Sequence, residues 1–325
     1  MTKRIGLSQI IDFLLKYLVL ILIIGLITVT AIVEPRFLSA DNITNVMRQF
    51  GPLSFIALGM TFIILSGFID LSIPGMISII AMMTLTMVDV VGEIPALILG
   101  LVLGVAIGAF NGTWLMTVGA DTQAKVLFIT FGMSQIFRSI ALLYTGGFSV
   151  NQNLLEHPMP VTRAIASGSW GPLSISFWMF LCFLIVLLVF QSKTALGRTI
   201  TYIGGNLKAA ELGGIPAKRI IVFVYALSGF MVAIGTIVLF SRVAVTVPSV
   251  GDFFERDAIM AVVVGGTSLQ GGRGSVVRTF MGVTLVILLS NCMNLLGVPS
   301  HLQEVARGAV LVLAIWLDHR RHARG

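Results

Sequence analysis

The stretch 257–275 reads DAIMAVVVGGTSLQGGRGS and changes character halfway along. Its first half is as apolar as a membrane-spanning helix, whereas its second half consists mainly of glycines, hydroxyl side chains and one arginine. Glycine favours breaks and tight turns, and backbone groups freed at a break in hydrocarbon must be buried by protein or reach a wet cavity. Two interpretations stay open: a plain cytoplasmic hairpin between two spans, or a hinge that forms part of a translocation path. The second makes Gly265, Gly266, Thr267 and Ser268 candidate path residues, with the two hydroxyls expected to satisfy freed carbonyls locally.

The composition around this stretch excludes a water-soluble protein. Of the 325 residues, 57% are hydrophobic and only 11% are charged, and apolar runs recur along the whole length. This pattern predicts an all-α fold, a polytopic helical bundle in a membrane, with the whole chain 1–325 forming one transmembrane domain. The net charge of +7 does not indicate nucleic-acid binding, because the basic residues flank apolar spans as the positive-inside rule describes.

We expect about ten membrane segments, whose boundaries follow the apolar runs. They cover residues 14–33, 52–68, 73–90, 95–117, 124–145, 173–191, 219–240, 258–270, 275–296 and 302–317. The eighth is short, and a partly re-entrant segment is the alternative there. The first has no small-residue cleavage site after it, so we interpret it as a retained span rather than a signal peptide. An even number places both termini on one side, where twelve basic residues stand against five on the other; this predicts cytoplasmic termini.

A polar segment at about 192–218 faces the cytoplasm in this topology. It reads SKTALGRTITYIGGNLKAAELGGIPAK, an amphipathic stretch punctuated by small residues and flanked by basic ones. Such a segment suits docking into the groove of a soluble partner, and the alternative is a linker that only joins two spans. The chain has no glycine loop followed by lysine and serine or threonine of the Walker type, so we do not expect it to hydrolyse nucleotide itself.

A second interruption lies in the stretch TFIILSGFIDLSIPGMISII. Pro74 suits the first turn of the following helix, and Ser72 could cap that helix. Asp70 stands between apolar neighbours, so it should face the bundle interior or water, or pair with a cation, for which Arg138 and Arg278 are candidates. We favour such a structural pairing over ion coupling, and we add Asp70 and Ser72 to the candidate translocation path. The two interruptions suggest a weak internal duplication of the kind found in transporters.

Other polar and small residues point to packing rather than chemistry. Gly100, Gly104 and Gly108 lie four apart and line up a groove where another helix can approach closely. The two cysteines lie in apolar runs without metal or disulfide spacing, and the four histidines lie in loops, at a span end or in the tail. No nucleophile–base pair or metal constellation is indicated within the bilayer. We therefore expect neither an enzyme nor a cofactor or metal site.

Four blocks of the sequence resemble one known family. GMTFIILSGFIDLS, LGRTITYIGGNLKAAELGGIPAKRI, DAIMAVVVGGTSLQGGRGS and NCMNLLGV are similar to blocks in the permease subunits of bacterial ABC importers for ribose and related simple sugars, a group that includes the autoinducer-2 importers. The resemblance extends from about residue 32 to residue 318, with the blocks in the family's order and spacing. The chain departs from the family pattern at Phe68, Ile73–Pro74, Arg278 and Asn291–Cys292, which leaves the solute open.

The resemblance implies the transmembrane subunit of an ATP-binding-cassette importer that moves a monosaccharide or similar small polar solute across the bacterial inner membrane. It implies three protein partners: a cytoplasmic ATPase subunit, an outer substrate-binding protein, and a second permease that is a copy or a paralogue. The family's coupling segment maps onto residues 194–215, and the matching positions are Gly197, Gly204, Gly205, Asn206, Ala209, Ala210 and Gly214. The alternative function is an ion-coupled secondary transporter with Asp70 as the coupling carboxylate. The shortage of other intramembrane acids counts against it.

Overall fold

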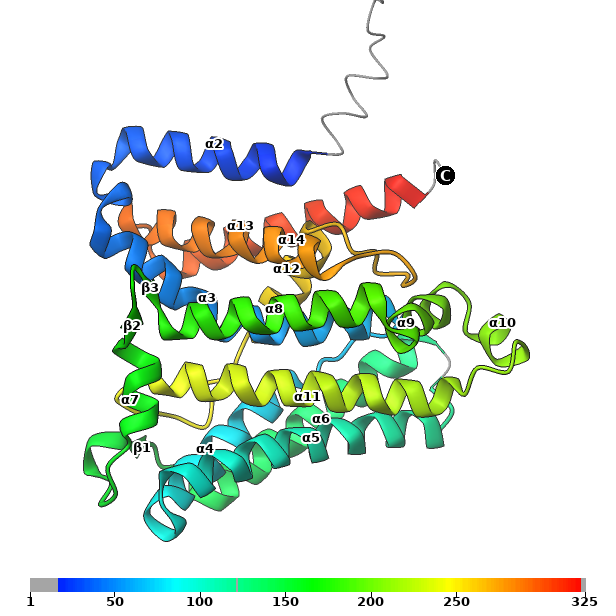
Figure 1. Cartoon of the computed structure of the whole chain (residues 1–325), viewed down its shortest axis with the longest axis horizontal. Helices are drawn as coiled ribbons and strands as arrows, with labels where there is room; N and C mark the ends of the chain where they lie inside the picture. Colours follow the sequence, from blue (N-terminus) through cyan, green and yellow to red (C-terminus); the bar gives the residue numbers. More distant parts are fainter. Residues whose placement is uncertain (1–16, 121, 323–325) are drawn as a thin grey trace, which may run out of the picture.

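Long helices that run side by side dominate the computed structural model, which describes residues 17–120 and 122–322 (Figure 1). Within those residues, 7 helices are long and apolar enough to cross a membrane. They are α3 (Ala40–Leu65), α4 (Ile73–Val91), α5 (Glu93–Thr117), α6 (Gln123–Thr145), α8 (Ile175–Lys193), α11 (Ala217–Ser241) and α13 (Val276–Leu295). The predicted all-α membrane bundle is confirmed.

Three further helices occupy the remaining expected spans: α2 (Leu18–Val33), α12 (Phe254–Val264) and α14 (Ser300–His322). Residues 14–16 of the first expected span lie outside the described residues. With 11 residues, α12 is only about 16 Å long, roughly half the thickness of a bilayer's hydrocarbon core. The short eighth segment expected from the sequence is thus a half-length helix, followed by irregular backbone.

The two ends of the bundle carry different short elements (Figure 1). At one end, which we call the α9–α10 end, lie the short helices α9 (Ala195–Gly205) and α10 (Leu207–Leu212). The start of α2 and the end of α14 also lie at this end. The opposite end, which we call the strand end, holds the remaining short elements. These are η1 (Pro35–Leu38), β1 (Val150–Asn151), η2 (Gln152–Leu154), α7 (Pro160–Ser167), β2 (Ser169–Trp170), β3 (Leu173–Ser174) and β4 (Val245–Thr246), with β1 paired to β4 and β2 to β3, both antiparallel.

Helix α3 forms the centre of the core. Every residue from Phe50 to Leu65 is buried, as expected of a helix that is apolar on all sides, and α3 packs against α8, α11, α12 and α13. The helix begins well before the expected start at residue 52. Ser39 Oγ accepts a hydrogen bond from Asn42 N at 3.3 Å and caps it, so polar residues that hydropathy assigns to a loop form its first turns.

The predicted close approach of a helix to the glycines of α5 is confirmed. A Cβ atom on Gly104 would collide with the carbonyl oxygen of Gly229 in α11, and one on Gly108 would collide with that of Tyr225. Gly100 faces the side chain of Thr84 in α4 instead. Because these glycines lack side chains, the backbones of α5 and α11 come into direct contact, which is how small residues stabilise helix pairs in membranes.

Candidate functional site

The chain between α8 and α11 folds into two short helices, which we call the α9–α10 unit. Thr194 Oγ1 accepts a hydrogen bond from Gly197 N at 3.0 Å and caps α9, and Asn206 Oδ1 accepts one from Ala209 N at 2.9 Å and caps α10. Both are side chains that favour helix N-termini. Gly214, with a φ of 81°, then turns the chain toward α11 in a conformation that favours glycine. The segment is therefore a structured element rather than a loose linker.

The seven coupling residues expected on this unit divide between two faces. Gly197, Gly204 and Ala210 lie against the protein, whereas Gly205, Asn206, Ala209 and Gly214 are exposed. The neighbouring glycines show the division best: a Cβ atom on Gly204 would collide with the carbonyl oxygen of Leu65, but one on Gly205 would have no atom within 4 Å. Gly204 thus allows a backbone contact, and Gly205 lies on an open surface.

Three large apolar side chains on the α9–α10 unit are exposed and were missed by the sequence analysis. Leu212 is 91% exposed, Tyr202 64% and Leu196 44%, and the basic residues Arg198 and Lys208 are exposed on the same unit. A groove of about 480 Å³ lies between the start of α9 and the start of α11, lined by Ala195, Leu196, Thr199, Gly214, Ile215, Pro216, Arg219, Ile220 and Phe223. Exposed apolar groups rimmed by polar ones mark interaction sites. The sequence did contain a signal for the exposed leucine: Leu212 stands directly before the pair Gly213–Gly214, at the end of α10.

The first interruption, residues 66–72, is a buried loop fastened by hydrogen bonds. Asp70 Oδ1 accepts from Ser72 N at 2.8 Å and from Ser72 Oγ at 2.6 Å. Asn111 Nδ2 of α5 donates to Ser72 Oγ at 2.8 Å, and Thr130 Oγ1 of α6 accepts from Leu71 N at 3.1 Å. The loop therefore connects the start of α4 to two neighbouring helices, and both Asp70 and Ser72 are buried.

Two expectations about this loop were wrong. Arg138 pairs with Asp252 at 3.0 Å, and Arg278 Nη1 donates to the carbonyl oxygen of Gly266 at 3.3 Å, so the described residues give Asp70 no ion pair. Ser72 does precede α4, but its hydroxyl donates to Asp70 instead of capping the helix, because a carboxylate two residues away is a strong acceptor. Pro74 lies in the first turn of α4 as expected.

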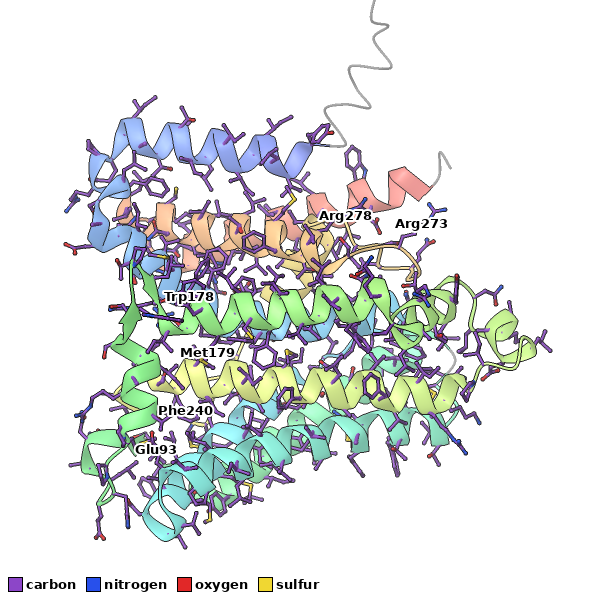
Figure 2. All side chains as sticks on the ribbon, in the orientation of Figure 1. Glu93, Trp178, Met179, Phe240, Arg273 and Arg278 are labelled. Atoms are coloured by element: carbon purple, nitrogen blue, oxygen red, sulfur yellow. The ribbon has the colours of Figure 1, made fainter. Side chains whose placement is uncertain are left out.

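The second interruption, residues 265–275, is called the α12–α13 loop here, and three of its glycines adopt left-handed backbone. Gly266, Gly271 and Gly272 have φ values of 101°, 83° and 71°, which other residues rarely adopt. A tight turn follows from Ser268 N donating to Arg273 O at 2.8 Å. Figure 2 shows Arg273 on this loop at the α9–α10 end, with Arg278 at the start of α13.

The hydroxyls of Thr267 and Ser268 in this loop have different surroundings. Ser268 Oγ accepts a hydrogen bond from Gln270 N at 3.2 Å. Thr267 Oγ1 is buried and has no hydrogen-bond partner among the described residues, so the expectation that Thr267 satisfies a freed carbonyl was wrong. The physical reason is its neighbour: a Cβ atom on Gly274 would lie 2.5 Å from Thr267 Oγ1, so the backbone of Gly274 covers the hydroxyl.

The two interruptions and α9 meet at one place, which we call the glycine junction and define as Gly67, Gly204, Gly271 and Gly272. Gly272 N donates to the carbonyl oxygen of Leu65 at 3.0 Å. A Cβ atom on Gly271 would lie 2.7 Å from the Cα of Gly67 and 2.8 Å from the carbonyl oxygen of Gly204. The structure therefore joins three segments that the sequence analysis had treated separately. Asp70 and Ser72 lie farther along the same loop, where α5 and α6 hold them.

At the strand end, a buried carboxylate holds the short helix α7. Glu93, at the start of α5, accepts hydrogen bonds from Thr162 N at 2.6 Å and from Val161 N at 2.9 Å. A negative charge at a helix N-terminus is favourable because the helix dipole is positive there. Figure 2 shows Glu93 near α7, at the opposite end of the molecule from Arg273 and Arg278.

A polar cavity of about 400 Å³ lies at the same end. It is lined by Gln152, Asn153, Leu155, His157, Pro158, Met159, Thr162, Arg163, Ser241, Arg242, Val243 and Ala244. Burial lowers the pKa of the Arg242 guanidinium, and the positive charge of Arg48 lowers that pKa further. The sequence analysis missed this cavity because its two walls are far apart in the chain and are brought together by the β1–β4 pair and by hydrogen bonds from Gln152 to the carbonyl oxygens of Phe240, Val243 and Ala244.

Comparison with known proteins decides what kind of membrane protein this is. The family model described as "Branched-chain amino acid transport system / permease component" matches residues 42–315. This chain belongs to the permease family of ATP-binding-cassette importers. The ribose import permease protein RbsC of Bacillus subtilis is 37% identical over 300 residues, 92% of this chain and 91% of that protein. RbsC of Haemophilus influenzae is 32% identical over 314 residues (96% and 95%), and the xylose transport system permease protein XylH of Escherichia coli is 31% identical over 343 residues (88% and 86%). No solved structure matches the chain significantly.

As an importer permease, the chain is a multi-pass protein of the bacterial inner membrane, in agreement with its apolar helices. Its relatives are permease subunits, which do not hydrolyse ATP themselves. The comparisons give no support to the ion-coupled carrier that a buried Asp70 had left open. The exposed α9–α10 unit and the glycine junction can therefore be considered as parts of an importer subunit.

Proposed function

We propose that this permease carries a monosaccharide or a similar small polar solute into the cytoplasm, driven by ATP hydrolysis on a separate subunit. The observation that carries the proposal is the set of relatives named for ribose import and xylose transport, which match 88% to 96% of the chain. Relatives that match along nearly the whole chain are more informative about the solute than the general description of the family model.

The ATPase subunit docks on the α9–α10 unit in this proposal. The exposed coupling residues Gly205, Asn206, Ala209 and Gly214 share this surface with Leu212 and Tyr202. A short helix pair with apolar tips and basic neighbours suits insertion into a groove on a soluble protein. The inward-facing Gly197, Gly204 and Ala210 act on coupling through the position of the unit rather than through contact with the ATPase.

Ten membrane segments and cytoplasmic termini remain our proposal for the topology of the single domain 1–325. Support comes from the ten helices that correspond to the ten expected spans, and from α12, whose half-length helix is continued by the α12–α13 loop to the α9–α10 end. The excess of basic residues on that side favours the cytoplasm. The strand end then faces outward, where the substrate-binding protein docks near α7 and the polar cavity. A second permease, identical or paralogous, completes the complex.

The translocation path runs beside the two interruptions in this proposal, near Asp70, Ser72, Gly265, Gly266, Thr267 and Ser268. Irregular backbone at membrane depth is typical of transporter binding sites, where freed backbone groups and hydroxyls bind the solute.

Uptake into sealed liposomes tests the proposal. The permease is reconstituted with its candidate ATPase and binding protein, and uptake of labelled ribose and xylose is measured with and without internal ATP. We expect uptake of at least one sugar that needs ATP and the binding protein. A proton or sodium ionophore should leave uptake unchanged while ATP is present. Uptake that collapses with the ionophore, or that needs no ATP, would contradict an ATP-driven importer.

A further inference from the structure

Side chains from three helices other than the adjoining α12 and α13 hold the α12–α13 loop in place. Gln123 Nε2 of α6 donates to Leu269 O at 2.7 Å, and Asp318 Oδ2 of α14 accepts from Leu269 N at 3.2 Å. Gln191 of α8 makes the third connection, at the other end of the loop. Each of these hydrogen bonds ends on the backbone of the loop or of Val276, directly after it, so together they fix where the loop lies rather than what it presents to solvent.

Gln191 uses both ends of its amide group. Its Nε2 donates to Gly274 O at 3.1 Å, and its Oε1 accepts from Val276 N at 3.0 Å. Val276 is the first residue of α13, and backbone N–H groups in the first turn of a helix have no partner within the helix. The side chain therefore ties the end of α8 to the beginning of α13.

Helix α9 is consequently attached to the α12–α13 loop at both of its ends. Near its start, Gly197 packs on the backbone of Gln191 itself, with a Cβ on Gly197 only 2.7 Å from the Cα of Gln191. At its far end, Gly204 belongs to the glycine junction, which contains Gly271 and Gly272 of the loop. Any displacement of α9 as a rigid helix has to displace the loop, or break both attachments.

The chain itself continues from α9 into α11, which also packs against α9 directly. This covalent connection passes through α10 and the pair Gly213–Gly214, which are both exposed. A Cβ on Gly214 would have no atom within 4 Å, and its φ is 81°. Glycine pairs of this kind bend easily because no side chain restricts their backbone.

We propose that Gln191 is a positioning residue that transmits movement of α9 to the α12–α13 loop and the start of α13, and so couples ATP hydrolysis to solute transport. The inference rests on the proposed function, in which the ATPase docks on the α9–α10 unit. Gln191 touches neither solute nor ATPase. It acts through the backbone of Gly274 and Val276.

The test measures solute molecules imported per ATP hydrolysed in the reconstituted complex. Gln191→Met keeps the length and shape of the side chain but removes both hydrogen bonds, and Ser192→Ala is the matched control, because the Ser192 hydroxyl only donates to Leu188 O within α8. We expect Gln191→Met to lower the import-to-hydrolysis ratio roughly tenfold. The loss of two ordinary hydrogen bonds changes an equilibrium constant by about this factor. ATPase binding and the control variant should match the wild type. An unchanged ratio in Gln191→Met would overturn the inference.

Two further measurements keep the inference testable if Gln191→Met folds poorly. Gln191→Glu retains an acceptor for Val276 N but loses the donor to Gly274 O, so its ratio should lie between those of the wild type and Gln191→Met. In the unmodified complex, ATP turnover should change amide hydrogen exchange at Gly272 and Val276 together with α9; a change confined to α9 would overturn the inference. A wild-type complex without ATP-dependent uptake would refute the proposed function itself, whereas normal wild-type coupling with unaffected Gln191 variants refutes only this step.

Discussion

Asp70 is a carboxylate buried in a membrane bundle without a cation beside it among the described residues. An unpaired charge in such a place is costly, and the local chain reduces that cost by directing two donors, Ser72 N and Ser72 Oγ, at one carboxylate oxygen. Asn111 extends the network into α5. The residue therefore acts as a local staple for the turn into α4, and its acceptor oxygen matters more than its charge.

A pair of substitutions separates these two properties. Asp70→Asn keeps an oxygen that can accept from Ser72, so we expect it to change the free energy of unfolding by less than about 1 kcal/mol, whereas Asp70→Ala leaves two buried donors unsatisfied and should cost about 3 kcal/mol. Thermal unfolding in detergent ranks the variants. Transport should be retained in Asp70→Asn, and its loss at unchanged stability would show that the charge itself has a function.

The sequence predicted that Asp70 faces the bundle interior, water or a cation rather than lipid, but not what surrounds it. Apolar neighbours on both sides are enough to predict that the carboxylate avoids lipid, since a charge in contact with hydrocarbon is costly. The partner could not be predicted, because it is a backbone amide and a hydroxyl two residues away rather than a distant arginine. Arg138 and Arg278 have partners of their own in Asp252 and the Gly266 carbonyl.

At the scale of elements, α9 is a helix with one face packed against the protein and one face exposed. Gly204 and Gly205 are adjacent in sequence but differ in their surroundings. Gly204 lets the backbones of α9 and Leu65 come into contact, whereas a Cβ on Gly205 would face open space. An amphipathic pattern could predict that the segment has two faces. The pattern could not predict which glycine lies on which face. That depends on where each helix begins, and the capping residues Thr194 and Asn206 fix these starting points.

A bulky residue on the open face should block docking without disturbing the fold. Gly205→Trp is expected to abolish binding of the ATPase in a pull-down while membrane insertion and melting temperature stay near those of the wild type, because a side chain there meets no atom of the permease within 4 Å of its Cβ. Gly132→Trp is the control, since Gly132 in α6 is equally unobstructed. Normal ATPase binding by Gly205→Trp would remove the docking role from this face.

At the scale of the whole molecule, hydropathy predicted the bundle well and its irregular parts poorly. Long apolar runs such as α5 and α11 appear in the structure within a few residues of the expected positions. The meeting of residues 67, 204 and 271–272 could not be predicted, because it depends on contacts between segments far apart in the chain. The shared glycines were visible in the sequence, but only the fold shows that they touch one another.

Cysteine labelling tests the proposed orientation of the two ends. The background is Cys182→Ala, in which only the buried Cys292 remains. Leu212→Cys and Trp170→Cys each add one thiol, at positions whose native side chains are 91% and 75% exposed and lie at opposite ends of the bundle. A membrane-impermeant maleimide should label Leu212→Cys in inside-out vesicles and Trp170→Cys in right-side-out vesicles. The reversed pattern would place the α9–α10 end outside, and labelling of both from one side would contradict the spanning bundle.

The hydrogen bond from Leu269 N to Asp318 Oδ2 has a consequence for how the protein is made. A ribosome delivers α14 last, so the backbone of residues 265–275 is already synthesised while one of its acceptors is still missing. Until Asp318 arrives, Leu269 N has to bond to water, which does not hold the loop in a fixed position. Maturation of this turn therefore has to wait for the final helix, and a nascent chain that stops before residue 318 is expected to be a target for membrane proteases.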